Sequence, residues 1–303
     1  MPATWIDLLD PTLDEVREKA PRELEETAIA QLLTPPAHED EPRPTLVGHG
    51  DYVFGVFLVA VANREKDLVY YQEIDVVLTH GVLLTVSKTP PGEKPYDPRP
   101  VRESCHPDDA TGMMLYRLVD DIAEHYLDLV DTLDDEIDEL EDNVETAPSE
   151  LTRNRVSELR HDMLHIRRTL APTRDAIRQI VDNVIEVERG TEIFPHDVEV
   201  SFNGAYDKLL RAFDGLELSR DLLASVRDYL QAKIANDQNE VMKRLTVIAS
   251  LLLLPTFIVG LYGQNFQHHF PEIHWQFGYL WSWALIVVTT IAQLIYFRRK
   301  KWI

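Results

Sequence analysis

The sequence predicts an α+β soluble domain, followed by a long helix and by two helices that span a membrane. Strand-like runs rich in β-branched and aromatic residues lie before residue 110, helical spacing of apolar residues follows, and two long uncharged stretches lie near the C-terminus. The expected parts are an α/β domain over 1–110, a helical hairpin over 111–197, a long helix over 198–262 whose end (245–262) is the first span, a loop over 263–277, a second span over 278–297 and a basic tail over 298–303.

Charge is distributed unevenly along the chain. The formal net charge is −22, from 52 acidic and 30 basic residues. Only two acids and six bases lie from Glu240 onward, which leaves a net charge of −26 in the first 239 residues. Because contacts to phosphate need Lys or Arg, such a body repels nucleic acid, and we expect no nucleic-acid partner. The acidic surface either concentrates cations or simply keeps the protein soluble.

Residues 1–110 combine helix and strand signals. Short helices are predicted over 11–20 and 21–33, each with a proline at its start. Strands are predicted in three runs rich in β-branched and aromatic residues. These runs are 52–62, 68–78 and 81–87, with His80-Gly81 as a turn before the last. Six prolines between Thr89 and Pro107 end this unit.

From Thr111 the apolar residues recur every three or four positions, which is typical of helices packed against one another. After a break, Ser149 is expected to cap a second helix that runs to about Glu188 and that Pro172 kinks or interrupts. The segment 131–142 holds eight acids. We interpret it as a solvated helix face or as a weak cation-attracting surface, since Mg²⁺ keeps most of its waters.

A third helical stretch runs from about Val198 into the first span. At about 1.5 Å per residue, a helix over 198–262 is about 100 Å long. Because no core of a single chain supports such a rod, we expect it to pack against other helices, including those of further copies of the chain.

Two stretches near the C-terminus are long enough to cross a bilayer. Residues 245–262 are 18 residues without a charge, and 278–297 are 20 more, close to the roughly 20 apolar residues that a span needs. Basic residues flank the pair on its outer ends, so the positive-inside rule places both flanks in the cytoplasm. We therefore expect a multi-pass protein of the plasma (inner) membrane, in contact with lipid, with both termini cytoplasmic. The alternative is two buried helices of a soluble protein.

One face of the helix that enters the first span is unusually polar or small, because steps of three or four residues bring such side chains together. These residues are Asn239, Met242, Thr246, Ala249, Leu253, Thr256 and Gly260. Such a stripe marks either close helix packing or the wall of an aqueous path. Its approach to Asn265, just beyond the span, favours the path, although a single loop asparagine is ordinarily a turn former.

Several other classes of protein are disfavoured. The single cysteine, Cys105, permits no intrachain disulfide. No P-loop, Gly-rich phosphate loop or Ser/His/Asp grouping is recognisable, so we expect neither an enzyme nor a bound cofactor. Neither span carries a charged side chain, which argues against a proton relay of carboxylates inside the membrane.

The loop between the spans and its flanks carry a recognisable pattern. Residues 262–266 read Tyr-Gly-Gln-Asn-Phe, 271–275 read Pro-Glu-Ile-His-Trp, and 277–279 read Phe-Gly-Tyr. Together with the residues at 239–257 and the basic ending at 296–302, this pattern resembles the CorA magnesium/cobalt transporter family, whose signature is Tyr-Gly-Met-Asn-Phe. A weaker resemblance covers 164–175.

This resemblance implies a homopentamer with an α/β cytoplasmic funnel, a long stalk helix and a pore lined by the first span. It implies a mouth formed by Gly263, Gln264 and Asn265, where Asn265 holds a hydrated cation through its water shell. The resemblance and the polar or small helix face together give a set of pore-lining and gate residues. The apolar members of this set form a constriction that closes by dewetting. The set is Asn239, Met242, Leu245, Thr246, Ala249, Leu253, Thr256 and Gly260.

The chain departs from the family pattern at the mouth. Gln264 stands where magnesium members carry methionine, which leaves the preferred ion open. The loop also holds Glu272 and the histidines His268 and His269, which either bind softer ions such as Zn²⁺ or are interfacial residues without a metal.

A second departure concerns regulation. The family's inhibitory magnesium sites use acids between subunits, but residues 203–205 here read Asn-Gly-Ala where an acid is expected. Asp207 and Asp228 are the candidate replacements. The prediction is a channel for Mg²⁺ and Co²⁺ driven by the membrane potential and gated by cytoplasmic divalent ions. The alternatives are a zinc transporter of the same superfamily and a membrane-tethered acidic scaffold or sensor that conducts nothing.

Overall fold

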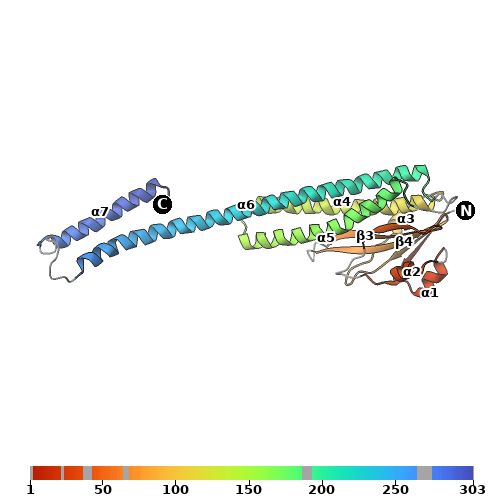
Figure 1. The fold of residues 1–303 in the computed structure, drawn as a ribbon, viewed down its shortest axis with the longest axis horizontal. Helices are drawn as coiled ribbons and strands as arrows, with labels where there is room; N and C mark the ends of the chain where they lie inside the picture. The colour runs from red at the N-terminus through yellow and green to blue at the C-terminus, as the bar shows by residue number, and fades with distance from the viewer. Residues whose placement is uncertain are drawn as a thin grey trace. The chain divides into compact units, whose positions relative to one another are not determined.

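The computed structural model describes residues 3–21, 24–36, 43–63, 68–185, 193–264 and 275–302. The chain divides into two compact units, Met1–Arg227 and Asp228–Ile303. The first unit holds a sheet and most of the helices, whereas the second holds two helical segments (Figure 1).

The first unit is built on one five-stranded sheet with the strand order β1-β5-β4-β3-β2. The strands are β1 (Thr4–Leu9), β2 (Thr45–Gly48), β3 (Val53–Asn63), β4 (Leu68–Leu78) and β5 (Val82–Ser87). β1 runs parallel to β5, and all other neighbours are antiparallel. The long β3–β4 pair, in register from Val53 opposite Leu78 to Asn63 opposite Leu68, forms the centre.

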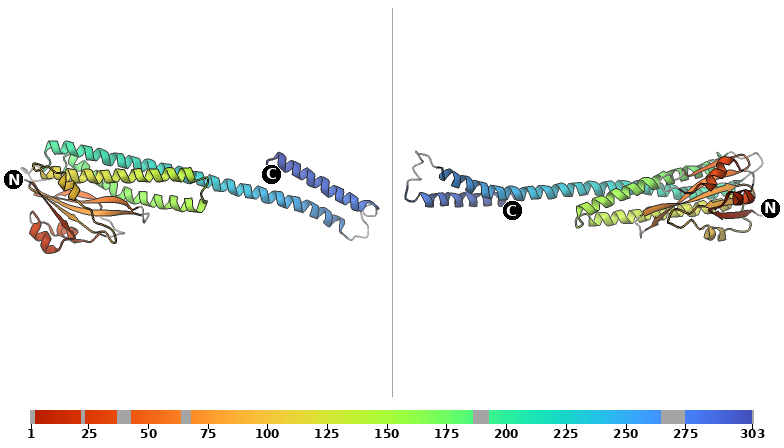
Figure 2. Two further views of the ribbon diagram at one scale, coloured as in Figure 1. Left: turned by 180° about the vertical axis from the view of Figure 1, so that it is seen from behind. Right: turned by 90° about the horizontal axis from the view of Figure 1, so that it is seen from below.

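Helices cover both faces of this sheet (Figure 2). α1 (Leu13–Lys19) and α2 (Glu26–Leu33) pack on one face, where Val16 and Leu32 meet Phe54 in a small apolar cluster. α3 (Arg99–Glu103) and α4 (Thr111–Asn143) follow in the chain, and residues of α4 share the larger core with Phe57 and Ile74 of the opposite face. The alternation of side chains along each strand therefore fills two separate cores.

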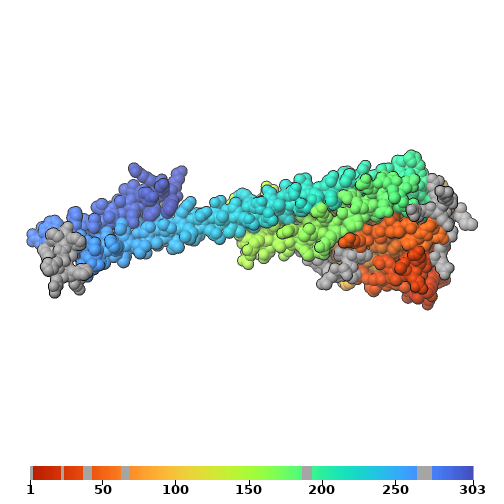
Figure 3. Space-filling model, in the orientation of Figure 1, coloured from red at the N-terminus to blue at the C-terminus, as the bar shows by residue number. Residues whose placement is uncertain are grey.

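Three long helices of the first unit share the larger core. They are α4, α5 (Ser149–Val181) and the N-terminal part of α6 (His196–Tyr262), and Figure 3 shows α5 and α6 packed along each other. Tyr126, Ile166 and Phe202, one from each helix, are fully buried, and burial of each such side chain stabilises the fold by about 1.5–3 kcal/mol. A Cβ on Gly215 would lie 2.9 Å from Val130 Cγ1, so this glycine permits close approach of α6 to α4.

A charged group is buried between β4, the end of β5 and α2. Lys88 Nζ lies 2.5 Å from Glu73 Oε1 and 2.8 Å from Asp75 Oδ2, and it donates to the carbonyl of Gln31 at 2.7 Å. Lys88, Glu73 and Asp75 are 2 %, 3 % and 0 % exposed. Burial raises the pKa of Asp75, to about 8, against the attraction of the lysine. Two carboxyl groups thus face one ammonium group, and the raised pKa of Asp75 favours its protonated form at neutral pH.

The second unit pairs the C-terminal part of α6 with α7 (Gly278–Arg299). Gln293 Nε2 on α7 donates to the carbonyl of Ser250 on α6 at 3.2 Å. α6 continues through Pro255, which has no N–H to give to the carbonyl of Leu251.

Two local predictions about helices were wrong, and a third was wrong in part. Pro172 lies inside α5 and does not interrupt it; the carbonyl that loses its N–H partner is that of Arg168, an exposed residue. Ser149 is the first helical residue and not the cap, a position that Pro148 takes without a side-chain bond. α5 ends at Val181 and not near Glu188, and Asn183 just beyond it adopts φ +52°, a left-handed conformation common after helix ends.

Candidate functional site

The two apolar stretches near the C-terminus are helical and lie open in the single chain. α6 and α7 are each long and apolar enough to cross a membrane, and only 11 % and 6 % of their most apolar windows are buried. A core helix of a soluble protein buries most of such a surface. In the described part of the second unit, these two helices are therefore much less buried than core helices of a soluble protein would be.

The predicted pore face lies on this open part of α6. Met242, Leu245 and Leu253 are 59 %, 57 % and 67 % exposed. The polar and small members are also uncovered, with Ala249 half-buried and the rest exposed. They are Asn239, Thr246, Thr256 and Gly260. The structure thus brings the predicted pore residues to one helix and, among the residues that it describes, leaves all of them except Ala249 exposed.

The opposite side of the same helix is the covered one. Val247 and Ile258 are buried, at 5 % and 6 % exposure. At 100° per residue, both lie roughly opposite Thr256 and Gly260 around the helix axis. One side of α6 is therefore packed within the chain, and the polar and small side is left for other contacts.

Two threonine hydroxyls on the open side have a defined orientation. Thr246 Oγ1 donates to the carbonyl of Met242 at 2.8 Å, and Thr256 Oγ1 donates to the carbonyl of Leu252 at 2.6 Å. Because the proton is engaged by the helix backbone, the oxygen lone pairs remain as acceptors. Oxygen acceptors are what the water shell of a hard cation binds to.

The predicted mouth begins where α6 ends. The N–H of Gly263 donates to the carbonyl of Val259 at 2.9 Å, and a Cβ on this glycine would approach that oxygen to 3.2 Å. Gln264 follows and is exposed. The other predicted residues of the mouth and loop, Asn265, His268, His269 and Glu272, lie outside the described residues.

Among the described residues of one chain, the candidate regulatory acids do not form a metal site. Asp207 and Asp228 are both exposed on α6, 21 positions apart. In the described part of the chain, no group of three or more His, Cys, Asp or Glu side chains is placed to hold a metal ion. A divalent ion bound by either aspartate needs further ligands from water or from another copy.

The acidic segment 131–142 of α4 has a structural role in part. Asp134 accepts a hydrogen bond from Ser219 of α6, and Glu136 pairs with Arg155 of α5. These acids connect α4 to its two neighbouring helices, so only the remainder of the segment is a solvated face.

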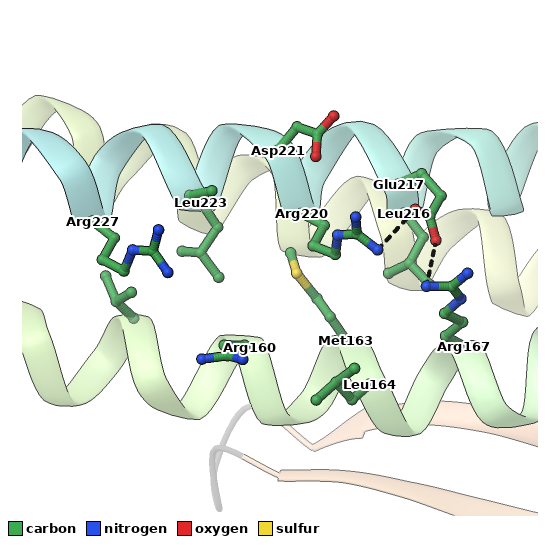
Figure 4. Close-up of a pocket in the computed structure, with 12 residues that line it drawn as sticks. Arg160, Met163, Leu164, Arg167, Leu216, Glu217, Arg220, Asp221, Leu223 and Arg227 are labelled. Atoms are coloured by element: carbon green, nitrogen blue, oxygen red, sulfur yellow. Dashed lines mark ion pairs between the residues drawn. The ribbon is translucent and has the colours of Figure 1, made fainter.

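Sequence reasoning missed a groove between α5 and α6 in the first unit (Figure 4). Its volume is about 350 Å³. Four arginines line it, Arg160 and Arg167 from α5 and Arg220 and Arg227 from α6. The signal was present in the sequence, since the members of each pair lie seven residues apart and thus on one side of their helix.

Comparison with known proteins agrees with this architecture. The chain combines an α+β unit with two helices that are long and apolar enough to cross a membrane. The model of the CorA-like Mg2+ transporter protein family matches residues 3–299, and the chain belongs to this family. The cobalt/magnesium transport protein CorA of Thermotoga maritima is 30% identical over 269 residues, which are 86% of this chain and 73% of the relative.

Two further matches extend the comparison. The putative metal ion transporter YfjQ of Bacillus subtilis is 30% identical over 86% of this chain and 78% of its own length. The complete structure of the CorA magnesium transporter from Methanocaldococcus jannaschii has the same fold, with a TM-score of 0.79 at 20% identity, covering 99% of this chain and 91% of that one.

Proposed function

We propose that the chain is one subunit of a homopentameric channel that carries Mg²⁺ and Co²⁺ across the plasma (inner) membrane. The observation that carries this proposal is the uncovered side of α6, where polar and small residues lead to Gly263 and Gln264 at the helix end. Copies of the chain that bring these sides together enclose a path in which the hydroxyl oxygens of Thr246 and Thr256 lie among apolar and small residues. Membership of the CorA-like family supports the same choice of cargo.

The path suits a hydrated divalent ion. Thr246 and Thr256 present hydroxyl oxygens to the water shell, and in our proposal Asn265 forms the outer ring that first receives it. Because neutral oxygens contact only the shell, the ion keeps its waters, as Mg²⁺ prefers. Met242, Leu245 and Leu253 form the apolar constriction, which closes by dewetting.

The driving force is the membrane potential. An inside-negative potential contributes about 2.3 kcal/mol per elementary charge per 100 mV, so about twice that for a divalent ion. Both termini are cytoplasmic in this arrangement. Cytoplasmic divalent ions close the channel by binding acids of adjacent copies, with Asp207 and Asp228 as candidates, since an ion that binds one state better shifts the population toward it.

Flux into proteoliposomes tests the proposal. Purified protein is expected to give potential-dependent uptake of Mg²⁺ and Co²⁺, and Asn265→Ala to abolish it while the assembly keeps its size on a sizing column. Gln276→Ala is the matched control, an amide at the other end of the same loop, and keeps normal flux. Absence of uptake by the unaltered protein contradicts the channel, and preference for Zn²⁺ in competition contradicts the choice of cargo.

A further inference from the structure

The groove between α5 and α6 is a separate site from the proposed ion path. All residues that line it belong to the first unit, from Val156 to Arg227. None of them is among the predicted pore, mouth or regulatory residues. Its volume of about 350 Å³ falls in the range of small-molecule sites, which is about 300–1,000 Å³.

The groove is positively charged although it lies in a strongly acidic protein. Glu217 pairs with Arg167 at 3.2 Å and with Arg220 at 3.0 Å. One carboxylate thus forms ion pairs with two of the four guanidinium groups. The second acid of the lining, Asp221, points away from the space between the helices (Figure 4). Arg160 is exposed and forms no ion pair within the part of the chain that the structure describes.

The floor of the groove is apolar. Met163 of α5 and Leu216 and Leu223 of α6 line it and are nearly buried, at 2–3 % exposure. Leu164 stands on the wall and is 44 % exposed. A ligand that fills the groove therefore meets apolar side chains below and guanidinium groups at the edges.

These two features together select a class of ligand. Guanidinium groups bind phosphate oxygens through paired hydrogen bonds, and they also stack on flat aromatic rings. A simple inorganic anion leaves the apolar floor uncovered, and an uncharged apolar molecule leaves Arg160 without a counter-charge. We propose that the groove binds a nucleoside di- or triphosphate, with the base on the apolar floor and the phosphates between Arg160 and the α6 arginines.

Binding to the full-length protein in detergent tests this proposal independently of ion flux. Isothermal titration with ATP, ADP, pyrophosphate and adenosine is done in EDTA, so that no divalent ion takes part. We expect saturable binding of ATP and ADP, at least tenfold weaker binding of pyrophosphate and adenosine, and weakening of nucleotide binding with rising salt.

The variants assign the site. Arg160→Ala is expected to weaken ATP binding at least tenfold, and Leu164→Asp, which adds a negative charge to the wall, to weaken it as well. Both positions are exposed, so neither change disturbs the core. Arg168→Ala is the matched control, an exposed arginine of the same helix outside the lining, and leaves the affinity unchanged. No binding of ATP, equal affinity for pyrophosphate, or equal loss in Arg168→Ala overturns the proposal.

Discussion

Replacing Lys88 by methionine tests the buried charged group of the first unit. The change keeps the length of the side chain and removes the ammonium that faces Glu73 and Asp75. Both carboxyl groups are almost inaccessible to water, so an uncompensated charge cannot remain there. Asp75 already holds a proton at neutral pH, because burial raises its pKa. In the variant, Glu73 therefore has to take up a proton when the chain folds.

The size of the effect follows from this proton uptake. A glutamate in an unfolded chain titrates near 4.3, so protonating it at pH 7 costs about 3.7 kcal/mol at 1.36 kcal/mol per pH unit. The lost hydrogen bond from Lys88 to Gln31 adds about 1 kcal/mol. The expected loss of stability is thus about 4–5 kcal/mol at pH 7. At pH 4.5 the protonation cost falls below about 1 kcal/mol, and the total to about 1.5 kcal/mol.

Thermal unfolding of the detergent-solubilised protein, followed by circular dichroism at pH 7 and pH 4.5, measures this difference. The variant is expected to unfold roughly 8–20 °C below the unaltered protein at pH 7, at about 2–4 °C per kcal/mol, and much closer to it at pH 4.5. Lys94→Met is the control, since Lys94 is exposed, and shifts the midpoint little. A small loss at pH 7, or an equal loss at both pH values, refutes the reasoning.

Two further predictions concern the ion path and the helix packing. Thr256→Val removes the hydroxyl acceptor while keeping the shape of the side chain, and it is expected to lower Mg²⁺ flux about fivefold (about 1 kcal/mol). Thr289→Val on α7, whose hydroxyl also donates to its own helix, is the control and leaves flux unchanged. Equal flux in the two variants contradicts the role of Thr256. Gly112→Ala places a Cβ 2.4 Å from the carbonyl oxygen of Ile193 and is expected to destabilise the folded protein by about 1–3 kcal/mol. Gly204→Ala, with no atom within 4 Å of its Cβ, is expected to stabilise it by about 0.5–1 kcal/mol. If the thermal midpoints of the two variants move in the same direction, the packing described here is contradicted.

Features that depend on a single continuous window of sequence were predicted well. β4 has the predicted bounds, Leu68–Leu78, because a buried run of β-branched and aromatic residues needs no distant information. The two apolar helices were predicted for the same reason, since length and composition alone decide whether a segment can cross a bilayer.

Features that depend on distant partners were missed. β1 and β2 are 6 and 4 residues long, too short for a clear periodic pattern, and β1 is a strand because β5 lies beside it. The arginine groove is formed by two helices that are far apart in sequence. The seven-residue spacing of the arginines can be read from each helix, but the sequence does not show that the two pairs face each other. For the candidate ion path, the sequence predicted which residues share one side of α6, but a single chain provides no facing wall.

The pairing of β1 with β5 sets an order of events during synthesis. Thr4 lies opposite Val82, so β1, once it has left the ribosome, waits for about 78 further residues before its partner strand emerges. At 5–20 residues per second this delay is roughly 4–16 s. During this time Trp5 and Leu8, which are buried in the finished fold, have no sheet to pack on. The apolar helices α6 and α7 emerge only after the sheet can close, because all five strands precede them in the chain.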